Sequence, residues 1–420
     1  MINGHVADFE KPISASLPMT GQPKIHFLSN GIFSTSIAGG DMVFFNLARA
    51  AARQGFAVNY FGGHAFQEVA RREQLPGTVT LTDDAPLAKS SGGLTGQFAL
   101  LRDFHGRYRR TLQLQNTIAP DDFVCAASDY WFDVLPVVHC AARHKLMVWN
   151  MESPALRQII QRSRPDVDAT RLAALHYWAS QEWSLRQFAR CPTRHMIYLH
   201  PLMEAKLEQL RIRATDRTLI SYGLDPAATE AMPEQKRIYD AVWIGRVHRQ
   251  KGVDDLLATF KFLAQKLENF RAILIGNLQK QLQPEIEKLG LQRHVEFSGF
   301  VSEAEKIRLF KASRVFLMPS KHEGSPRVIG ESIVAVTPVV AYEIPNYRPL
   351  FGDLVRYVPP FDLAAFQKAA ELEILKMRTG ENYLQRIDLA RFKQENSWAE
   401  AQEHFLGALA KLRAITDAQK

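Results

Sequence analysis

Short apolar runs alternate with helix-length segments along nearly the whole chain of 420 residues, and this alternation begins twice. The first series of predicted strands comprises Lys24–Leu28, Ala57–Phe61, Thr78–Leu81, Phe123–Ala127, Leu146–Trp149, Met196–Leu199 and Thr218–Tyr222; the second comprises Ala241–Ile244, Ala272–Ile275, Val295–Phe297, Val315–Met318 and Val339–Tyr342. Strands that alternate with helices form parallel sheets with right-handed crossovers. The pattern therefore predicts an α/β protein with two Rossmann-like, doubly wound domains.

The break between the two series lies near residues 225–235, where Pro226, Pro233 and several small or acidic residues interrupt the pattern. We therefore expect a first domain over residues 23–230 and a second over residues 236–395. Residues 1–22 lack the apolar core of an export signal, which indicates a loose N-terminal extension. A C-terminal helix over residues 396–420 is expected to pack back towards the first domain.

The composition excludes several classes of protein. With 46% hydrophobic and 23% charged residues, the chain is typical of globular proteins, and no apolar run approaches the ~20 residues that span a membrane. Its three cysteines, Cys125, Cys140 and Cys191, have no paired metal-ligand spacing, so neither a disulfide framework nor a zinc site is predicted. These features favour the cytoplasm.

The net charge of +8 is unevenly spread, because basic residues outnumber acidic ones between Arg143 and Arg217 and nearly all of these basic residues are arginines. Arginine binds phosphate in a bidentate manner, so this segment suits peripheral contact with the anionic inner face of a membrane or with a lipid-linked diphosphate. A solvated helical face explains the excess equally well. No nucleic-acid motif accompanies it, and nucleic acid is not predicted as a partner.

The most informative motif is the segment Glu323–Glu331, which follows the predicted strand Val315–Met318. Ser325 before Pro326 predicts a helix N-cap with proline at the first helical position. A helix N-terminus offers unpaired backbone N–H groups to an anion, while the two terminal glutamates can accept bonds from separate hydroxyl groups. This combination suits a sugar nucleotide, in which two polyols flank a diphosphate. Each glutamate alone is more often an ordinary surface residue.

A second segment supports this interpretation. In Ala241–Gly252 an apolar strand runs into Gly245, Arg246 and, five residues later, Lys251. Gly245 permits close approach of the backbone to a ligand, and the two cations supply the guanidinium fork and the point charge that a diphosphate leaving group needs. Taken singly, such cations are more often solvated. Ligands in open α/β sheets bind beyond the carboxyl ends of strands, so this loop and the Glu323 loop are expected to share one cleft.

Taken in order, these motifs resemble those of the retaining glycosyltransferases of family 4, which have the GT-B architecture of two facing Rossmann-like domains. The resemblance spans most of the chain and rests on Gly39-Gly40, Ser221–Asp225, Gly245-Arg246, Lys251-Gly252, Phe297–Val301, Pro319-Ser320, Glu323–Glu331, Thr337–Val340 and Ser397-Trp398. It implies transfer of a hexosyl group from a nucleotide diphosphate sugar to a glycan, an oligosaccharide precursor or a lipid-linked acceptor. The nucleotide sugar is then a substrate, and neither a cofactor nor a catalytic metal is expected.

The resemblance also implies roles for single residues. Arg246 and Lys251 correspond to the pair that neutralises the donor diphosphate, Glu331 to the ribose-binding carboxylate, and Glu323 to the carboxylate near the transferred sugar. Retaining transfer in this family is described as front-side attack, so Glu323 is expected to position the sugar and stabilise charge rather than to act as a nucleophile. Further donor contacts are implied for Gly39, Gly40, Gly245, Val301, Ser325, Pro326, Arg327 and Val328.

Three departures from the family pattern keep other functions open. The segment Val148–Ser153 stands where related enzymes often carry a histidine near the acceptor, Val336 replaces the glycine that usually precedes the Thr-Pro-Val segment, and Gly276-Asn277-Leu278 lacks a second glycine. One alternative is a GT-B protein that binds a nucleotide sugar without turnover. A less favoured alternative is a sugar-nucleotide epimerase built on the same fold.

Overall fold

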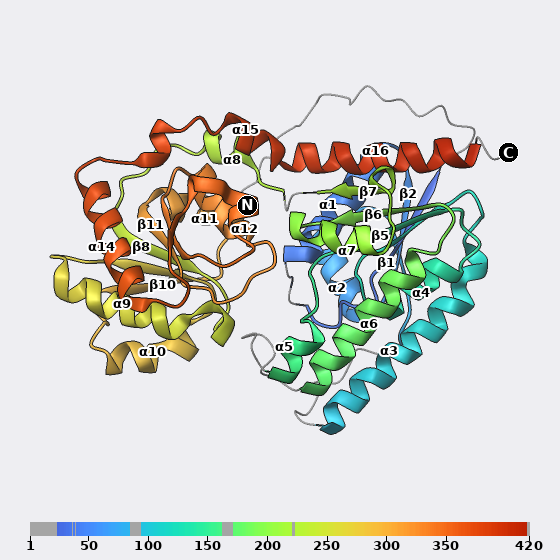
Figure 1. Ribbon diagram of the computed structural model, residues 1–420, viewed down its shortest axis with the longest axis horizontal. Coiled ribbons are helices and arrows are strands. Elements are labelled where there is room, and N and C mark those ends of the chain that lie inside the picture. Colours follow the sequence, from blue (N-terminus) through green and yellow to red (C-terminus); the bar gives the residue numbers. More distant parts are fainter. Residues whose placement is uncertain are drawn as a thin grey trace.

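The computed structural model describes residues 23–417 apart from residues 36, 38, 85–93, 162–170, 221 and 222, so the predicted extension over residues 1–22 lies outside the described residues. Two parallel sheets, each flanked by helices, lie side by side (Figure 1). The seven-stranded sheet has the order β3-β2-β1-β4-β5-β6-β7, and the six-stranded sheet has the order β10-β9-β8-β11-β12-β13. The predicted α/β class with two doubly wound sheets is confirmed.

The N-terminal sheet and its helices are drawn from blue to green in Figure 1. Their bounds are β1 Lys24–Leu28, α1 Gly39–Arg53, β2 Ala57–Gly62, α2 His64–Arg72, β3 Thr78–Leu81, α3 Leu94–Leu114, β4 Phe123–Ala126, α4 Trp131–His139, β5 His144–Trp149, α5 Leu156–Gln161, α6 Arg171–Phe188, β6 Arg194–Tyr198, α7 Glu204–Gln209 and β7 Arg217–Leu219. The strands begin and end close to their predicted positions. β7 starts one residue before the predicted strand Thr218–Tyr222 and ends at Leu219, and residues 221 and 222 of that prediction lie outside the described residues.

The C-terminal part of the chain forms the second sheet and its helices. Their bounds are α8 Pro226–Ala231, β8 Tyr239–Ile244, α9 Val253–Lys266, β9 Ala272–Ile275, α10 Gln279–Lys288, β10 Val295–Gly299, α11 Glu303–Lys311, β11 Ser313–Met318, α12 Arg327–Val334, β12 Val339–Tyr342, α13 Arg348–Phe351, β13 Arg356–Val358, α14 Leu363–Arg378, α15 Ala390–Glu395 and α16 Trp398–Asp417. The sequence did not predict β13. This short strand pairs only with β12 at the sheet edge, so it lacks the continuous apolar run of an inner strand.

The last helix, α16, belongs spatially to the N-terminal sheet. It runs along that domain (Figure 1) and contacts α1, β5, β6 and β7. Phe405 on α16 is fully buried in the same core cluster as Phe27 of β1, with ring centroids 6.5 Å apart. The N-terminal core is therefore completed by the C-terminal end of the chain.

The two segments that connect the domains pair with each other at one point. Leu224 N–H donates to Asn396 O at 2.6 Å, and Trp398 N–H donates to Leu224 O at 3.0 Å. Gly223 beside this crossing has a left-handed backbone (φ 60°), and a Cβ on it would lie 2.0 Å from the Trp398 indole. Only glycine adopts this left-handed backbone without strain and also leaves room for the Trp398 indole, which explains why this linker position is glycine.

The sheet orders define where ligands are expected. In the N-terminal sheet the strand order reverses between β1 and β4, and in the C-terminal sheet between β8 and β11. Open α/β sheets bind ligands beyond the carboxyl ends of strands at such switch points. The loops after β8 and β11 are those that carry Arg246, Lys251 and Glu323.

Candidate active site

The loops after β8 and β11 are fastened to each other. Gly252 at the start of α9 has φ 64°, and a Cβ there would lie 2.0 Å from the carbonyl oxygen of Pro319. Lys321 N–H donates to Gln250 O, and the Gln250 side-chain amide donates to His322 O, both at 2.7 Å. The strand ends therefore present one continuous surface rather than two independent loops.

This surface brings two of the three predicted catalytic residues, Lys251 and Glu323, together. Lys251 Nζ lies 2.7 Å from Glu323 Oε1, and the Glu323 side chain is only 9% exposed. Arg246, which follows Gly245 at the end of β8, is exposed, and its guanidinium pairs with no described side chain. One cation is therefore paired and one is available, which suits an anionic ligand placed between them.

Asn346 and His200, which sequence reasoning missed, hold the Glu323 loop. The Asn346 side-chain amide donates to Glu323 O at 2.7 Å and contacts Gly324 O at 3.3 Å. His200, buried after β6 in the other domain, lies with Nε2 2.9 Å from Asn346 O, and its Nδ1 accepts from Leu202 N–H at 3.0 Å. Nε2 is therefore the protonated nitrogen that donates across the domain boundary. The one sequence signal was the position of His200 directly after a predicted strand.

Ser325 does not cap α12, so this prediction is wrong. Its hydroxyl donates to Leu199 O of the N-terminal domain at 2.9 Å, and the helix begins at Arg327 with Pro326 at the N-cap position and no side-chain cap. The Ser-Pro pair is a local signal for a cap. Here a carbonyl from the other domain takes the hydroxyl instead, so Ser325 joins the two domains.

Glu331 lies at the centre of a second charged cluster. Its Oε1 is 2.9 Å from Lys306 Nζ and 2.8 Å from Arg327 Nε, while its Oε2 is buried and has no hydrogen-bond partner among the described residues. Lys306 on α11 is itself 8% exposed and also pairs with Glu303 at 2.8 Å. A buried acceptor without a partner is costly unless a ligand supplies a donor. Sequence reasoning missed Lys306 and assigned Arg327 to the donor, whereas the structure pairs Arg327 with Glu331.

The remaining predicted donor residues differ in how closely they are packed. Val301 and Val328 are half-buried against the C-terminal core. Gly245 is half-buried, and a Cβ there would lie 2.8 Å from the Trp243 indole. Gly39 and Gly40 form the first turn of α1; a Cβ on Gly40 would lie 3.0 Å from the Asn150 amide, whereas one on Gly39 would meet open space. Of the three predicted donor glycines, Gly245 and Gly40 thus have a close-packing reason to be glycine, whereas Gly39 has none.

The segment after β5 faces the Glu323 loop from the N-terminal domain, since a Cβ on Gly324 would lie 3.4 Å from the Met151 side chain. The Gln181 amide of α6 fixes this segment, because it donates to Met151 O at 2.8 Å and to Asp129 Oδ2 at 2.6 Å. Burial raises the pKa of Asp129 to about 6. No histidine stands in this segment, so it departs from the pattern of the family that the sequence resembles.

Neither a metal cluster nor a membrane span is found in the described parts of the chain. No three His, Cys, Asp or Glu side chains among these residues are grouped as metal ligands would be. No described helix has the length and apolar character needed to cross a bilayer.

Known proteins resemble this chain most clearly in its C-terminal part. Residues 229–385 match the family model "Glycosyl transferases group 1". The 2-deoxystreptamine N-acetyl-D-glucosaminyltransferase of Streptomyces fradiae is 28% identical over 138 residues, which are 30% of this chain and 32% of that protein. The alpha-D-kanosaminyltransferase of Streptomyces kanamyceticus is 24% identical over 263 residues, which are 59% of this chain and 58% of that protein.

Solved structures extend the likeness to both domains. Anabaena HepE in complex with UDP and glucose has a TM-score of 0.64 at 18% identity, with 93% of this chain and all of that chain covered. A S. aureus TarM variant in complex with fondaparinux, alpha-GlcNAc-glycerol and UDP has a TM-score of 0.66 at 9% identity, with 92% and 100% covered. The chain spans only about a quarter to a third of the length of the first curated relatives it matches. The described part of the chain has the GT-B fold.

Proposed function

We propose that this protein is a glycosyltransferase that moves a hexosyl group from a nucleotide diphosphate sugar to a glycan, an oligosaccharide precursor or a lipid-linked acceptor, with retention of the anomeric configuration. The observation that carries the proposal is the ion pair of Lys251 and Glu323, 2.7 Å apart, where the loops after β8 and β11 meet. Arg246, in the same loop as Lys251, has a guanidinium that pairs with no described side chain. A diphosphate needs the two cations, and a sugar that develops positive charge needs the carboxylate.

The reaction would proceed as follows. The bond between the anomeric carbon and the diphosphate oxygen breaks, and its electron pair stays on the diphosphate, where Arg246 and Lys251 stabilise the added charge. An acceptor hydroxyl attacks the same face of the sugar, and its proton passes to the departing phosphate oxygen. Glu323 holds the sugar and offsets its transient positive charge. The unpartnered Oε2 of Glu331 would accept a hydrogen bond from a ribose hydroxyl.

Solved relatives suggest which donors to test first. Solved structures of HepE and of the TarM variant are complexes with UDP, and one HepE structure is a complex with UDP-glucose. We therefore place UDP-hexoses first in a donor panel, followed by other nucleotide hexoses. A cytoplasmic site, where nucleotide sugars are made, fits such substrates.

The direct test measures nucleoside diphosphate release and transfer to a mixed glycan acceptor pool, with the anomeric configuration of the product read by NMR. We expect release that depends on acceptor and a product with the configuration of the donor. Binding of a donor without turnover would favour the non-catalytic alternative. Interconversion of the free nucleotide sugar without acceptor would favour the epimerase. No donor binding at all would refute the assignment of the site.

A further inference from the structure

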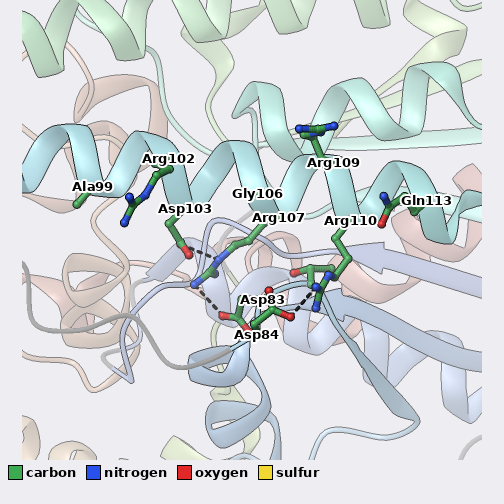
Figure 2. Close-up of a pocket in the computed structure, with 11 residues that line it drawn as sticks. Asp83, Asp84, Ala99, Arg102, Asp103, Gly106, Arg107, Arg109, Arg110 and Gln113 are labelled. Carbon is green, nitrogen blue, oxygen red and sulfur yellow. Dashed lines mark ion pairs between the residues drawn. The ribbon is translucent and has the colours of Figure 1, made fainter.

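A second recess lies in the N-terminal domain, away from the Lys251–Glu323 pair. It has a volume of about 560 Å³ and is bounded by the residues after β3 and by one face of α3 (Figure 2). Small-molecule sites typically have volumes of ~300–1,000 Å³, so this pocket is large enough for a polar group with its attached sugar. None of the residues named by the motifs lies in its wall.

The floor of the pocket holds an ionic network centred on Arg107. Arg107 is 1% exposed, and its guanidinium lies 3.0 Å from Asp83 and 2.8 Å from Asp103 while it donates to Asn30 O at 3.0 Å. Asp83 also lies 2.6 Å from His64 Nδ1. Asp83 and Asp103 therefore share the Arg107 guanidinium, which offsets part of their negative charge.

The rim of the pocket is cationic. Arg102 and Arg109 are exposed, and neither guanidinium pairs with a described side chain. Arg110 lies 2.5 Å from Asp84, whose side chain is 83% exposed. A solvated pair of this kind contributes little stability, so Arg110 can turn to a stronger anion. Up to three guanidinium groups thus surround the opening, which suits the bidentate binding of phosphate or carboxylate oxygens.

The pocket opens on the same sheet edge as the candidate active site, because Thr82–Asp84 follow β3 and Asn150–Ser153 follow β5, and all these strands are parallel. The order β3-β2-β1-β4-β5 separates the two places by four strand spacings of ~4.8 Å, or roughly 19 Å. A molecule that reaches both places must therefore be extended.

We propose that this pocket binds an anionic group, a phosphate or a carboxylate, of an extended acceptor whose free hydroxyl end lies at the Glu323 loop. The inference rests on the proposed transfer reaction and narrows its acceptor class to elongated anionic molecules. A diphosphate-linked glycan and an acidic oligosaccharide share this chemistry. Arg102, Arg109 and Arg110 are then acceptor-binding residues rather than catalytic ones.

Gly106 provides a selective way to fill the pocket. It lies on the pocket face of α3, and a Cβ there would meet nothing within 4 Å. Gly106→Trp should therefore occupy the space without a clash, and loss of a helical glycine favours the helix. Gly407→Trp on α16 is the matched control, because a Cβ at that helical glycine also meets nothing within 4 Å.

Calorimetric titration with inorganic pyrophosphate tests the pocket without any transfer assay. The wild type should bind at two sites. The double variant Arg246→Ala, Lys251→Ala should lose the donor site, while Gly106→Trp and the double variant Arg102→Ala, Arg109→Ala should each weaken the other site at least about tenfold. Gly407→Trp should match the wild type. Two unchanged sites in Gly106→Trp would overturn the proposal.

Transfer assays then distinguish the sources of the anion. The acceptors are a polyprenyl-diphosphate-linked oligosaccharide, a uronic-acid oligosaccharide and a neutral oligosaccharide. With the anionic acceptor to which the wild type transfers the sugar, Gly106→Trp should raise the acceptor KM about tenfold or more. The donor KM and kcat should stay within about twofold of the wild-type values. An unchanged acceptor KM with every acceptor would refute the assignment. If the wild type transfers to none of them, the proposed function fails, and the pyrophosphate result decides on the pocket alone.

A membrane surface is a different partner with a different signature. Sedimentation with phosphatidylglycerol vesicles measures membrane binding. If the Arg102→Ala, Arg109→Ala variant loses vesicle binding while Gly106→Trp keeps it in full, the arginines form a surface patch for membranes. That result would overturn the proposal of an anion-binding pocket. Equal vesicle sedimentation of the wild type and both variants would support it.

Discussion

Nζ of Lys251 lies 2.7 Å from Oε1 of Glu323, although the two residues are 72 positions apart in the chain. Each comes from a loop at the carboxyl end of its own strand, and the adjacency of β8 and β11 brings them together. In the proposed reaction, the donor diphosphate would compete with Glu323 for the Lys251 ammonium. The Glu323 carboxylate would then be free to face the sugar on which positive charge develops.

Glu323→Gln is expected to lower kcat about 100-fold or more, because the amide keeps the shape but loses the charge that stabilises the sugar in the transition state. The donor KM should change by less than about threefold, since the diphosphate contacts remain. Steady-state kinetics with the donor selected by the panel measures both values. Glu381→Gln, at an exposed position after α14, serves as the control. Wild-type kcat in Glu323→Gln would exclude a catalytic role for this carboxylate.

Lys306→Met is expected to raise the donor KM about tenfold and leave kcat nearly unchanged. The variant removes the ammonium 2.9 Å from Glu331, so this carboxylate keeps only Arg327 and is less well placed for a ribose hydroxyl. The matched control is Lys311→Met on the same helix. That lysine is equally buried but bonds to Met232 O and Glu234, away from the site. A donor KM that rises equally in both variants would indicate a general effect on α11.

Sequence reasoning succeeded where the signal was local. Runs of apolar residues located the strands, and glycines with adjacent charges located the loops that carry Arg246, Lys251 and Glu323. Partners that depend on strand order were not accessible in this way. Lys306 reaches Glu331 from a neighbouring helix, and His200 reaches Asn346 over 146 positions. The failed cap at Ser325 has the same cause, since the local signal said nothing of Leu199 in the other domain.

Asn346→Asp is expected to lower kcat about tenfold with the donor KM within about threefold, because a carboxylate oxygen replaces the N–H donor to Glu323 O and repels that carbonyl. His200→Leu, which removes the donor to Asn346 O, should have a similar effect, whereas His200→Gln can restore the bond and most of kcat. Kinetics combined with urea unfolding separates position from stability. Full kcat in His200→Leu would show that the interdomain bond does not position Glu323.

Val336→Gly is expected to raise the free energy of unfolding by about 1 kcal/mol. Val336 has φ 53°, a left-handed conformation that strains a β-branched residue, so the backbone retains the geometry for which the resembled family uses glycine. Arg237 and Asn382 hold this turn through bonds to the Val336 carbonyl at 3.1 and 2.9 Å. Urea unfolding measures the change. A loss of stability would show that the half-buried isopropyl group contributes more than the strain costs.

His195 should make the protein less stable in acid. Burial lowers its pKa from 6.5 to about 4, with Lys411 of α16 acting in the same direction and Asp216 opposing it. Between these two pKa values the unfolded chain binds a proton at His195 that the folded chain does not, so stability is full above pH 6.5 and falls as the pH drops. The expected loss from this group is about 2 to 3 kcal/mol at pH 4.5.

The variant His195→Gln tests this. Its glutamine can still bond to Thr218, which lies 2.7 Å from His195 Nε2, but it does not titrate. Urea unfolding measures the free energies of unfolding of the wild type and His195→Gln at pH 7.5 and pH 4.5. From the higher to the lower pH, the free energy of His195→Gln relative to the wild type should rise by this amount. The exposed His105→Gln is the control and should show no such change. An equal difference at both pH values would mean that His195 stays in the same protonation state in the folded and unfolded chains.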